Sequence, residues 1–119
     1  MYIADNAMLM LLANEIYRDD TFVNIAFDQI SYLFGRNSLH HSYVTGYGIN
    51  YPENIHHRVV IANKSKLNGA LVGGPDSSIE GYDLPAAKMY FDNKDIYQTN
   101  EIAIYYNSPL IFALSFFQN

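Results

Sequence analysis

Two short stretches of the sequence hold residue types that could act on a polar substrate. The first covers residues 42–50, rich in Gly and Tyr, and is followed by His56, His57 and Arg58. Because side chains alternate along an extended segment, His56 and Arg58 would point to the same side, where an imidazole and a guanidinium can bind hydroxyl or carboxylate groups. The same residues also fit a structural interpretation, with partly exposed loop histidines and a salt bridge at Arg58. Taken alone, the residue types favour the structural interpretation.

The second stretch contains two carboxylates nine residues apart, Asp92 and Glu101. Two such groups can face one cleft when a loop joins them, and general acid catalysis needs a protonated carboxyl group near the leaving oxygen. The structural interpretation assigns Asp92 to a turn and Glu101 to the first turn of a helix, where the helix dipole favours a negative charge. Residue types alone again favour this second interpretation.

Other chemistries have less support. The adjacent pairs His40-His41 and His56-His57 would diverge, and the first pair has no carboxylate at an obvious ligand spacing, so we expect no metal site. The sequence contains no cysteine, which excludes a disulfide, a thiolate ligand and a cysteine nucleophile. The glycine-rich run at residues 69–76 lacks the Lys-Ser/Thr ending of a phosphate-binding loop and predicts a turn at Gly73-Gly74. We therefore expect no cofactor.

Composition narrows the class of partner. Twelve acidic against seven basic residues give a formal charge of -5 over 119 residues, which offers no basic surface for nucleic acid or an anionic membrane. The apolar run at residues 7–13 is too short to span a membrane. Aromatic residues make up 15% of the chain and can serve packing or stack on sugar faces. A neutral or polymeric substrate fits this composition best.

Helical periodicity predicts three helices. A stretch from Asp5 to Tyr17, apolar around most of its circumference, predicts the first, and apolar residues from Phe22 to Phe34 recur at helical spacing. The charged break at residues 18–21 supplies N-cap chemistry, so these two helices would form an antiparallel hairpin. A last helix is predicted from about Asn100 to Phe117. We expect a break or a late start near Pro109, because proline lacks the N–H that a helix interior needs.

The region between the second and the last helix, residues 35–100, has no long amphipathic period. Gly, Pro, Asn, Asp and Ser interrupt its short apolar pieces, as in loops. Loops of this length are uncommon in compact domains and are usually functional or disordered. The apolar and aromatic content argues against disorder. The sequence therefore predicts an all-α chain of about three helices with long, ordered, functional loops.

Taken together and in this order, these pieces resemble glycoside hydrolase family 9. Residues 42–58 resemble the family's histidine signature, and residues 90–108 resemble its acidic signature, with every fixed position filled by an allowed residue type. Residues 69–76 are similar to the Gly-Ala-hydrophobic-Val-Gly-Gly-Pro-Asp run typical of the family. Residues 33–38 resemble the Leu-Gly-Arg-Asn end of the preceding helix. The resemblance covers nearly the whole chain.

The resemblance implies a cellulase-type enzyme, built on an (α/α)6 toroid of six helical hairpins, that cleaves β-1,4-glucosidic bonds in cellulose or related β-glucans. In the family pattern Glu101 would be the general acid, Asp92 an accessory acidic residue and His56 a substrate-orienting residue. Arg58 and Tyr47 would bind the substrate together with His56. The family's calcium ligands lie largely upstream, so the resemblance assigns no metal ligand to residues 1–119.

One part of the family's machinery has no counterpart in these 119 residues. The family inverts the anomeric centre, which requires a second carboxylate that activates water on the opposite face of the sugar. In the family this base lies in an Asp-Ala-Gly-Asp motif near the start of the catalytic domain, and the sequence has no such motif. We therefore expect residues 1–119 to be the C-terminal part of the domain, inactive alone and partnered by the missing N-terminal part. The parent enzyme is expected to be secreted, although no signal-peptide pattern occurs here.

Two other functions stay open. Residues 1–119 could form a stand-alone carbohydrate-binding or degenerate non-catalytic module, with Tyr47, Tyr51, His56 and Arg58 as a sugar platform. Its mark would be a folded monomer that binds cello-oligosaccharide without hydrolysing it. A helical interaction domain with no sugar site leaves both signatures unexplained and ranks last.

Overall fold

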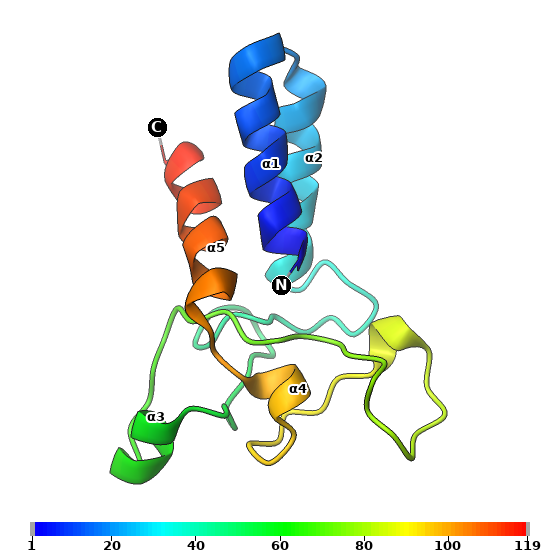
Figure 1. Ribbon diagram of the computed structural model, residues 1–119, viewed down its shortest axis with the longest axis vertical. Coiled ribbons are helices and arrows are strands. Elements are labelled where there is room, and N and C mark those ends of the chain that lie inside the picture. Colours follow the sequence, from blue (N-terminus) through cyan, green and yellow to red (C-terminus); the bar gives the residue numbers. More distant parts are fainter. Residues whose placement is uncertain (1, 119) are drawn as a thin grey trace.

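Three long helices rise from one side of a layer of loops and short helices in the structure, a computed structural model that describes residues 2–118 (Figure 1). The long helices are α1 (Tyr2–Tyr17), α2 (Asp20–Leu33) and α5 (Ile104–Phe116). The loop layer contains α3 (Arg58–Asn63), the 3-10 helix η1 (Ala86–Lys88) and α4 (Tyr97–Asn100). Residues 2–118 form no strand, only isolated bridges, so the predicted all-α chain with long ordered loops is confirmed. No helix in this range is long and apolar enough to cross a membrane.

The turn between α1 and α2 forms as its polar residues predict. Asp19 is the N-cap of α2, and its carboxylate accepts a hydrogen bond of 2.9 Å from the Thr21 N–H. Hydrogen bonding from the Thr21 side chain, and secondly from this backbone N–H, stabilises the charged carboxylate and so lowers the pKa of Asp19. Helix α2 ends before Gly35, whose φ of 116° suits a glycine. Local sequence therefore specifies both ends of α2 and with them the hairpin. Helix α1 begins at Tyr2, earlier than the predicted Asp5.

Helix α5 runs through Pro109 without a break, so the predicted break is wrong. The helix does start later than the predicted Asn100, at Ile104, but five residues before Pro109 rather than at it. Pro109 lies in the second turn, where its missing N–H leaves the carbonyl of Tyr105, four residues earlier, without its helical partner. Tyr105 is 64% exposed, so water can hydrogen-bond to that carbonyl. The proline ring itself is buried with Tyr106, Leu110 and Ala113 on one face of the helix. Burial of the ring and solvation of the carbonyl together allow the helix to continue.

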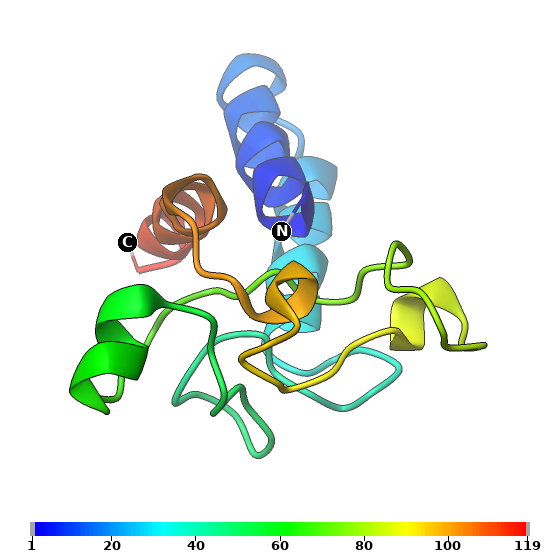
Figure 2. The ribbon, with the colours of Figure 1, turned by 60° about the horizontal axis from the view of Figure 1, so that its bottom comes forward.

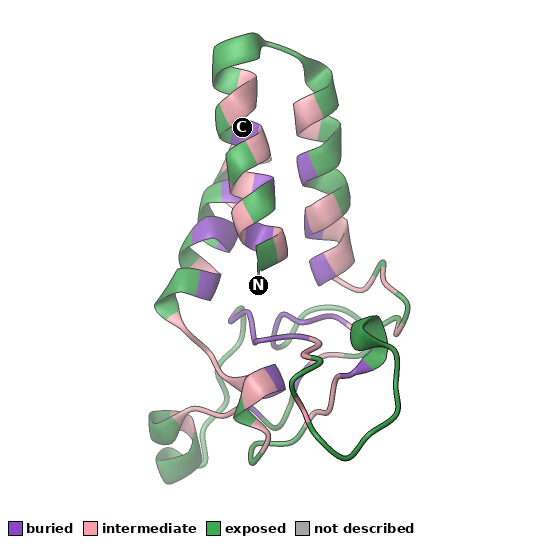
Figure 3. Ribbon diagram, turned by 45° about the vertical axis from the view of Figure 1, so that its right-hand side comes forward, coloured by how far each residue is buried: buried purple, intermediate pink, exposed green. Residues whose placement is uncertain are grey.

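Helix α1 packs against both α2 and α5 and supplies the centre of the core (Figures 1 and 3). Ala4, Ala7 and Leu11 follow one another at helical spacing and are buried. The small alanines let the neighbouring helices approach closely, and burying a leucine such as Leu11 stabilises the fold by about 1.5–3 kcal/mol. The facing side chains of α2 and α5 are Ala26, Ile30, Leu33, Tyr106, Leu110 and Ala113.

The other faces of these helices carry large apolar side chains that stay exposed in the described part of the chain. Tyr2, Ile16 and Ile104 are 79%, 74% and 88% exposed. Single exposed apolar residues are ordinary, but rows of them along adjacent helices mark a surface that packs against something else. The prediction of a first helix that is apolar around most of its circumference is confirmed by this exposure.

Loop segments far apart in the sequence lie side by side beneath the helices (Figure 2). The bridges pair Val44 with Leu71 and Val72 with Ile102, both antiparallel, and His56 with Glu101, parallel. Val44, Leu71 and Val72 are buried and belong to the same core as the helices. The long loops are therefore ordered because they share the core of the helical part.

A glycine pair lets two of these segments approach closely. A Cβ added at Gly73 would lie 2.4 Å from the carbonyl oxygen of Gln98, so no side chain fits there. Gly74 has a φ of 76°, and its N–H donates a hydrogen bond of 2.9 Å to the carbonyl of Thr99. Gly73 and Gly74 therefore do more than form the predicted turn, because they also fix residues 98 and 99, which lead into Glu101.

Candidate functional site

The parallel bridge brings His56 and Glu101 side by side, although 45 positions (101 minus 56) separate them in the sequence. The His56 N–H donates a hydrogen bond of 2.9 Å to the carbonyl of Asn100. Residues paired across a bridge project their side chains to the same face, so the imidazole and the carboxylate share one side of the loop layer. Within residues 2–118 no hydrogen bond or ion pair joins these two side chains. Both are therefore available to a ligand.

Glu101 does not lie in the first turn of a helix, so the structural interpretation of this residue is wrong. It is the C-cap residue of α4, with φ -68° and ψ 142°, and α5 begins only at Ile104. The C-terminal end of a helix favours cations rather than a carboxylate. Glu101 instead sits on an extended connector between two helices, where the neighbouring residue Ile102 is fixed by its bridge to Val72.

The ring of His56 is oriented by a hydrogen bond between its Nδ1 and the carbonyl of Lys94, at 2.7 Å. A carbonyl oxygen only accepts hydrogen bonds, so Nδ1 carries the proton. In the neutral imidazole Nε2 is then an acceptor, and it has no other partner in the described residues. The Tyr97 ring lies beside the imidazole, with ring centroids 6.1 Å apart. This arrangement presents Nε2 to a hydroxyl group of a ligand.

The carboxylate of Asp92 fixes the loop that leads to His56. It accepts hydrogen bonds from the backbone N–H groups of Glu53 and Asn54, at 3.0 and 2.9 Å, and from the Asn54 side-chain amide at 3.2 Å. These partners are 38 and 39 positions away, so the Asp92 side chain serves distant backbone groups. The turn that the structural interpretation assigns to Asp92 is present in the backbone, where the Asn93 N–H donates a hydrogen bond of 2.9 Å to the Phe91 carbonyl. The Asp92 carboxylate thus accepts three hydrogen bonds that hold residues 53 and 54 in place.

Asn100 ties the acidic stretch together directly before Glu101. Its side chain is fully buried, and its amide nitrogen donates to the carbonyls of Phe91 and Asn93, the latter at 3.1 Å. Its amide oxygen accepts a hydrogen bond of 3.0 Å from the Tyr90 hydroxyl. A buried amide satisfied on both sides fixes its backbone, because breaking the set would leave several polar groups unpaired.

Tyr90 supplies the proton that this network needs. Burial is the main cause that raises the pKa of Tyr90 far above its ordinary value, and the Asp92 carboxylate adds to the effect. The ring packs against His41 and Tyr43, with centroids 4.9 and 5.2 Å apart. The phenol therefore stays neutral, and it donates to Asn100 throughout the neutral and mildly alkaline range.

A second asparagine joins the loop layer to α5. The Asn107 amide oxygen accepts from the Leu71 N–H at 2.8 Å, and its amide nitrogen donates to the carbonyls of Leu71 and Ala103, at 3.2 and 2.9 Å. Ala103 is the last residue of the connector that carries Glu101, and Leu71 precedes Val72, which bridges to Ile102 in that connector. Asn107 thus holds the start of α5 in register with the bridged loop segments.

Sequence reasoning missed Asn100 as a functional residue and included Asn107 only as a member of the acidic stretch. The single local signal for Asn100 is its place beside Glu101. Its partners lie seven and nine positions away in an irregular loop, where no periodic pattern predicts a contact. Only the folded loop shows that this amide is buried and satisfied.

Arg58 and Tyr47 are not brought into contact with the pair of His56 and Glu101. The extended segment ends at His57, which is the N-cap of α3, so the alternation that would align Arg58 with His56 stops one residue too early. Arg58 is exposed and forms no salt bridge within residues 2–118, so the structural salt bridge is wrong as well. Tyr47 is 55% exposed and lies against Gly69.

Two of the remaining histidines have local structural contacts, and His57 caps α3 by accepting a hydrogen bond of 3.4 Å from the Val60 N–H. His41 hydrogen-bonds through Nδ1 to the carbonyl of Ser42, and its ring packs against Tyr43 and Tyr90. In residues 2–118 no group of three or more His, Cys, Asp or Glu side chains could hold a metal ion. The chemistry available to the described site is therefore that of Glu101, His56 and their hydrogen-bonded supports.

Comparison with known sequences gives one family. The sequence model described as Glycosyl hydrolase family 9 matches residues 1–114. Endoglucanase D of Acetivibrio thermocellus is 44% identical over 112 residues, which are 94% of this chain and 17% of that enzyme. The chain thus spans about a fifth or less of the length of such relatives. The resemblance seen in the two signatures is confirmed.

Solved structures agree with the sequence match. A metagenome-derived glycoside hydrolase family 9 endoglucanase superposes with a TM-score of 0.85 at 40% identity, covering 93% of this chain and 21% of that one. The cellulase Cel9M of C. cellulolyticum, in complex with cellobiose, gives a TM-score of 0.79 at 33% identity, covering 98% and 28%. The helices and loops described above correspond to part of the (α/α)6 toroid of these enzymes.

We predict that Asn100→Ala loosens the acidic stretch selectively. Removing the amide leaves the Tyr90 hydroxyl without its acceptor and takes one donor from each of the Phe91 and Asn93 carbonyls, which keep bonds from the Thr99 hydroxyl and the Ile96 N–H. The expected cost is about 1–3 kcal/mol of unfolding free energy. Hydrogen exchange of residues 90–101 should accelerate about tenfold or more in the full-length polypeptide that carries residues 1–119, while α1 exchanges as before. Asn63→Ala, at an exposed asparagine of α3, is the matched control. Unchanged exchange in residues 90–101 would contradict the role assigned to Asn100.

Proposed function

The chain belongs to glycosyl hydrolase family 9, and from that membership we propose that it forms the C-terminal part of a catalytic domain that hydrolyses β-1,4-glucosidic bonds in cellulose or related β-glucans. The proposal is supported by relatives named as endoglucanases and by the similar cellulase that was solved with cellobiose. The observation that carries it is the parallel bridge between His56 and Glu101, which gives a carboxyl group and an imidazole one shared face.

In the proposed reaction Glu101 is the general acid. Its carboxyl group gives a proton to the glycosidic oxygen as the bond from that oxygen to the anomeric carbon breaks, so the leaving sugar departs as an alcohol. The bridge and the Asn100 network support this role, because a general acid must lie within about 2.6–3.2 Å of the oxygen that it protonates. If the connector at Glu101 were mobile, the carboxyl group would not stay within this distance of the glycosidic oxygen.

His56 is proposed to bind the sugar next to the scissile bond, and Arg58 and Tyr47, which do not contact the His56–Glu101 pair, are proposed to bind the substrate elsewhere. Because Nδ1 of His56 is occupied by the Lys94 carbonyl, Nε2 is the atom that would accept a hydrogen bond from a sugar hydroxyl. Arg58 has no ion-pair partner among the described residues, so its guanidinium is available to sugar oxygens. Asp92 is the accessory acidic residue, and it acts by holding residues 53 and 54 in place before His56.

The proposed mechanism is inverting, so a second carboxylate must remove a proton from the attacking water as that water bonds to the anomeric carbon. The two carboxyl groups of an inverting glycosidase are about 6.5–9.5 Å apart. Asp92 is a poor candidate for this base, because its oxygens accept three hydrogen bonds from the His56 loop. We propose that the base comes from a part of the same domain outside residues 1–119, since the Asp-Ala-Gly-Asp motif is not in this sequence.

The partner proposed for the exposed apolar faces of α1 and α5 is that other part of the domain, which would also build the opposite wall of the cleft. Packing against it would remove side chains such as Ile16 and Ile104 from water, and apolar burial stabilises by about 25 cal/mol per Å². An insoluble glucan cannot enter a cell, so we further propose that the complete enzyme acts outside the cell that makes it.

We predict that residues 1–119 alone release no reducing sugar from a soluble β-glucan. The general acid is present, but the base and the opposite wall are not. The measurement is a reducing-sugar assay on the purified 119-residue chain, with the Glu101→Gln version of the same chain as background. Release above that background would refute the proposal that the acid lies in residues 1–119 and the base outside them.

In the full-length polypeptide, Glu101→Gln should lower kcat on cello-oligosaccharides by about a hundred- to ten-thousandfold, the usual contribution of a general acid. Substrate binding, measured by calorimetry, should change little, because the amide keeps the size of the carboxyl group. Glu80→Gln, at an exposed loop glutamate, is the matched control and should leave kcat unchanged. Normal turnover in the Glu101→Gln variant would contradict the assignment of Glu101 as the acid. Binding of cello-oligosaccharide without any turnover by the unsubstituted polypeptide would instead favour a binding module without catalysis.

A further inference from the structure

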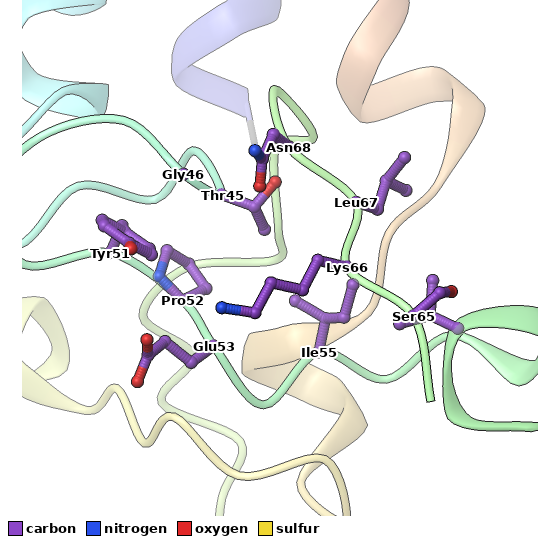
Figure 4. Close-up of a pocket in the computed structure, with 11 residues that line it drawn as sticks. Thr45, Gly46, Tyr51, Pro52, Glu53, Ile55, Ser65, Lys66, Leu67 and Asn68 are labelled. Atoms are coloured by element: carbon purple, nitrogen blue, oxygen red, sulfur yellow. The ribbon is translucent and has the colours of Figure 1, made fainter. Parts of the chain in front are cut away.

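A pocket of about 170 Å³ opens between the loop at residues 45–55 and the loop at residues 65–68 (Figure 4). Its floor is formed by three buried residues, Thr45, Pro52 and Ile55. Neither the general acid nor the substrate-orienting histidine lines it. The reaction proposed above therefore makes no use of this space.

The pocket lies behind the segment that carries His56. His56 is paired with Glu101 across the bridge and His57 has extended dihedral angles, so side chains next to His56 alternate away from the side on which it faces Glu101. The side chain of Ile55 contributes to the pocket. The pocket and the His56–Glu101 pair therefore occupy opposite faces of one loop segment, and a ligand in the pocket does not occupy the reaction site.

Backbone hydrogen bonds hold the two walls of the pocket together. Thr45 accepts at its carbonyl from the Gly69 N–H, at 2.7 Å, and donates its own N–H to the Ala70 carbonyl, at 3.0 Å. Its hydroxyl oxygen accepts from the Ala70 N–H at 2.9 Å. A Cβ added at Gly46 would lie 2.6 Å from the Asn68 side chain, so that amide packs directly on the glycine backbone. The pocket is therefore preformed.

Two opposite charges line the same pocket without pairing. Lys66 reaches across the opening, with its ammonium group towards Pro52 and Glu53 (Figure 4). No ion pair in residues 2–118 includes Lys66 or Glu53, so each is available to a ligand. Such a wall suits a ligand whose neighbouring groups both donate and accept hydrogen bonds, as sugar hydroxyls do, whereas Glu53 disfavours a free anion.

The size and the apolar parts of the pocket agree with one sugar ring. Pockets for drug-sized ligands measure about 300–1,000 Å³, so a space of about 170 Å³ is too small for an oligosaccharide. Tyr51, Pro52 and Ile55 offer an apolar and aromatic surface for the C–H face of a ring. We propose that this pocket binds a single pyranose unit of a β-glucan, at a second site separate from the one formed by His56 and Glu101.

The proposal goes beyond the hydrolytic function and can be tested apart from it. The full-length polypeptide is prepared with Glu101→Gln to prevent turnover and with labelled Ile and Leu methyl groups. Titration with D-glucose or D-xylose should shift the methyl signals of Ile55 and Leu67 in a saturable way. Stronger binding of glucose would assign the pocket to a backbone unit, and stronger binding of xylose to a branch. The open-chain polyol sorbitol should give no saturable shift.

Lys66→Met should weaken sugar binding about tenfold, because it removes a charged hydrogen-bond donor, and Glu53→Gln should weaken it in the same direction. Lys64→Met, at an exposed lysine outside the pocket, is the matched control and should bind as before. The proposal is overturned if no sugar shifts Ile55, if sorbitol acts like glucose, or if Lys66→Met binds unchanged while its methyl spectrum remains folded. Inactivity of the unsubstituted enzyme would count against the hydrolase proposal without changing these shifts.

Discussion

The hydrogen bond from the His56 N–H to the carbonyl of Asn100 is the contact on which the site depends, because it joins two loops that nothing else in the local sequence would bring together. The bond forms one side of the bridge that aligns His56 with Glu101. Each partner is held from behind by a buried or half-buried polar group, the His56 loop by Asp92 and the Glu101 connector by Asn100. These contacts hold two irregular loops in register although no regular ladder joins them.

What local sequence specifies was predictable, and what distant contacts specify was not. The hairpin of α1 and α2 follows from helical periodicity and from the Asp19 cap, so the sequence alone predicts it. The partners of Asp92 lie 38 and 39 positions away, and no propensity or period encodes such a contact. The position of Glu101 was misjudged for the same reason, since the helix was predicted to begin at about Asn100, which places Glu101 in its first turn, whereas α5 begins at Ile104. Pro109 was misjudged because local helix chemistry does not include burial of its ring.

The family signatures supplied what the physical reasoning could not. In isolation each of the two stretches fits ordinary loop chemistry, and only their order along the chain indicates a hydrolase. The structure then gives physical content to the signatures: the acidic stretch contains its own buried asparagine network, and the histidine stretch ends on an extended segment with two usable faces. One face presents His56 beside Glu101, and the other closes a preformed pocket with unpaired charges.

The most direct measurement is a structure of the full-length polypeptide with Glu101→Gln and a cello-oligosaccharide bound across the site. The account predicts that the side-chain amide at position 101 lies about 2.6–3.2 Å from one glycosidic oxygen, with Nε2 of His56 in hydrogen-bond reach of a hydroxyl on the adjoining sugar. A glycosidic oxygen held beside another carboxyl group, with position 101 out of reach, would contradict the central claim that Glu101 is the acid.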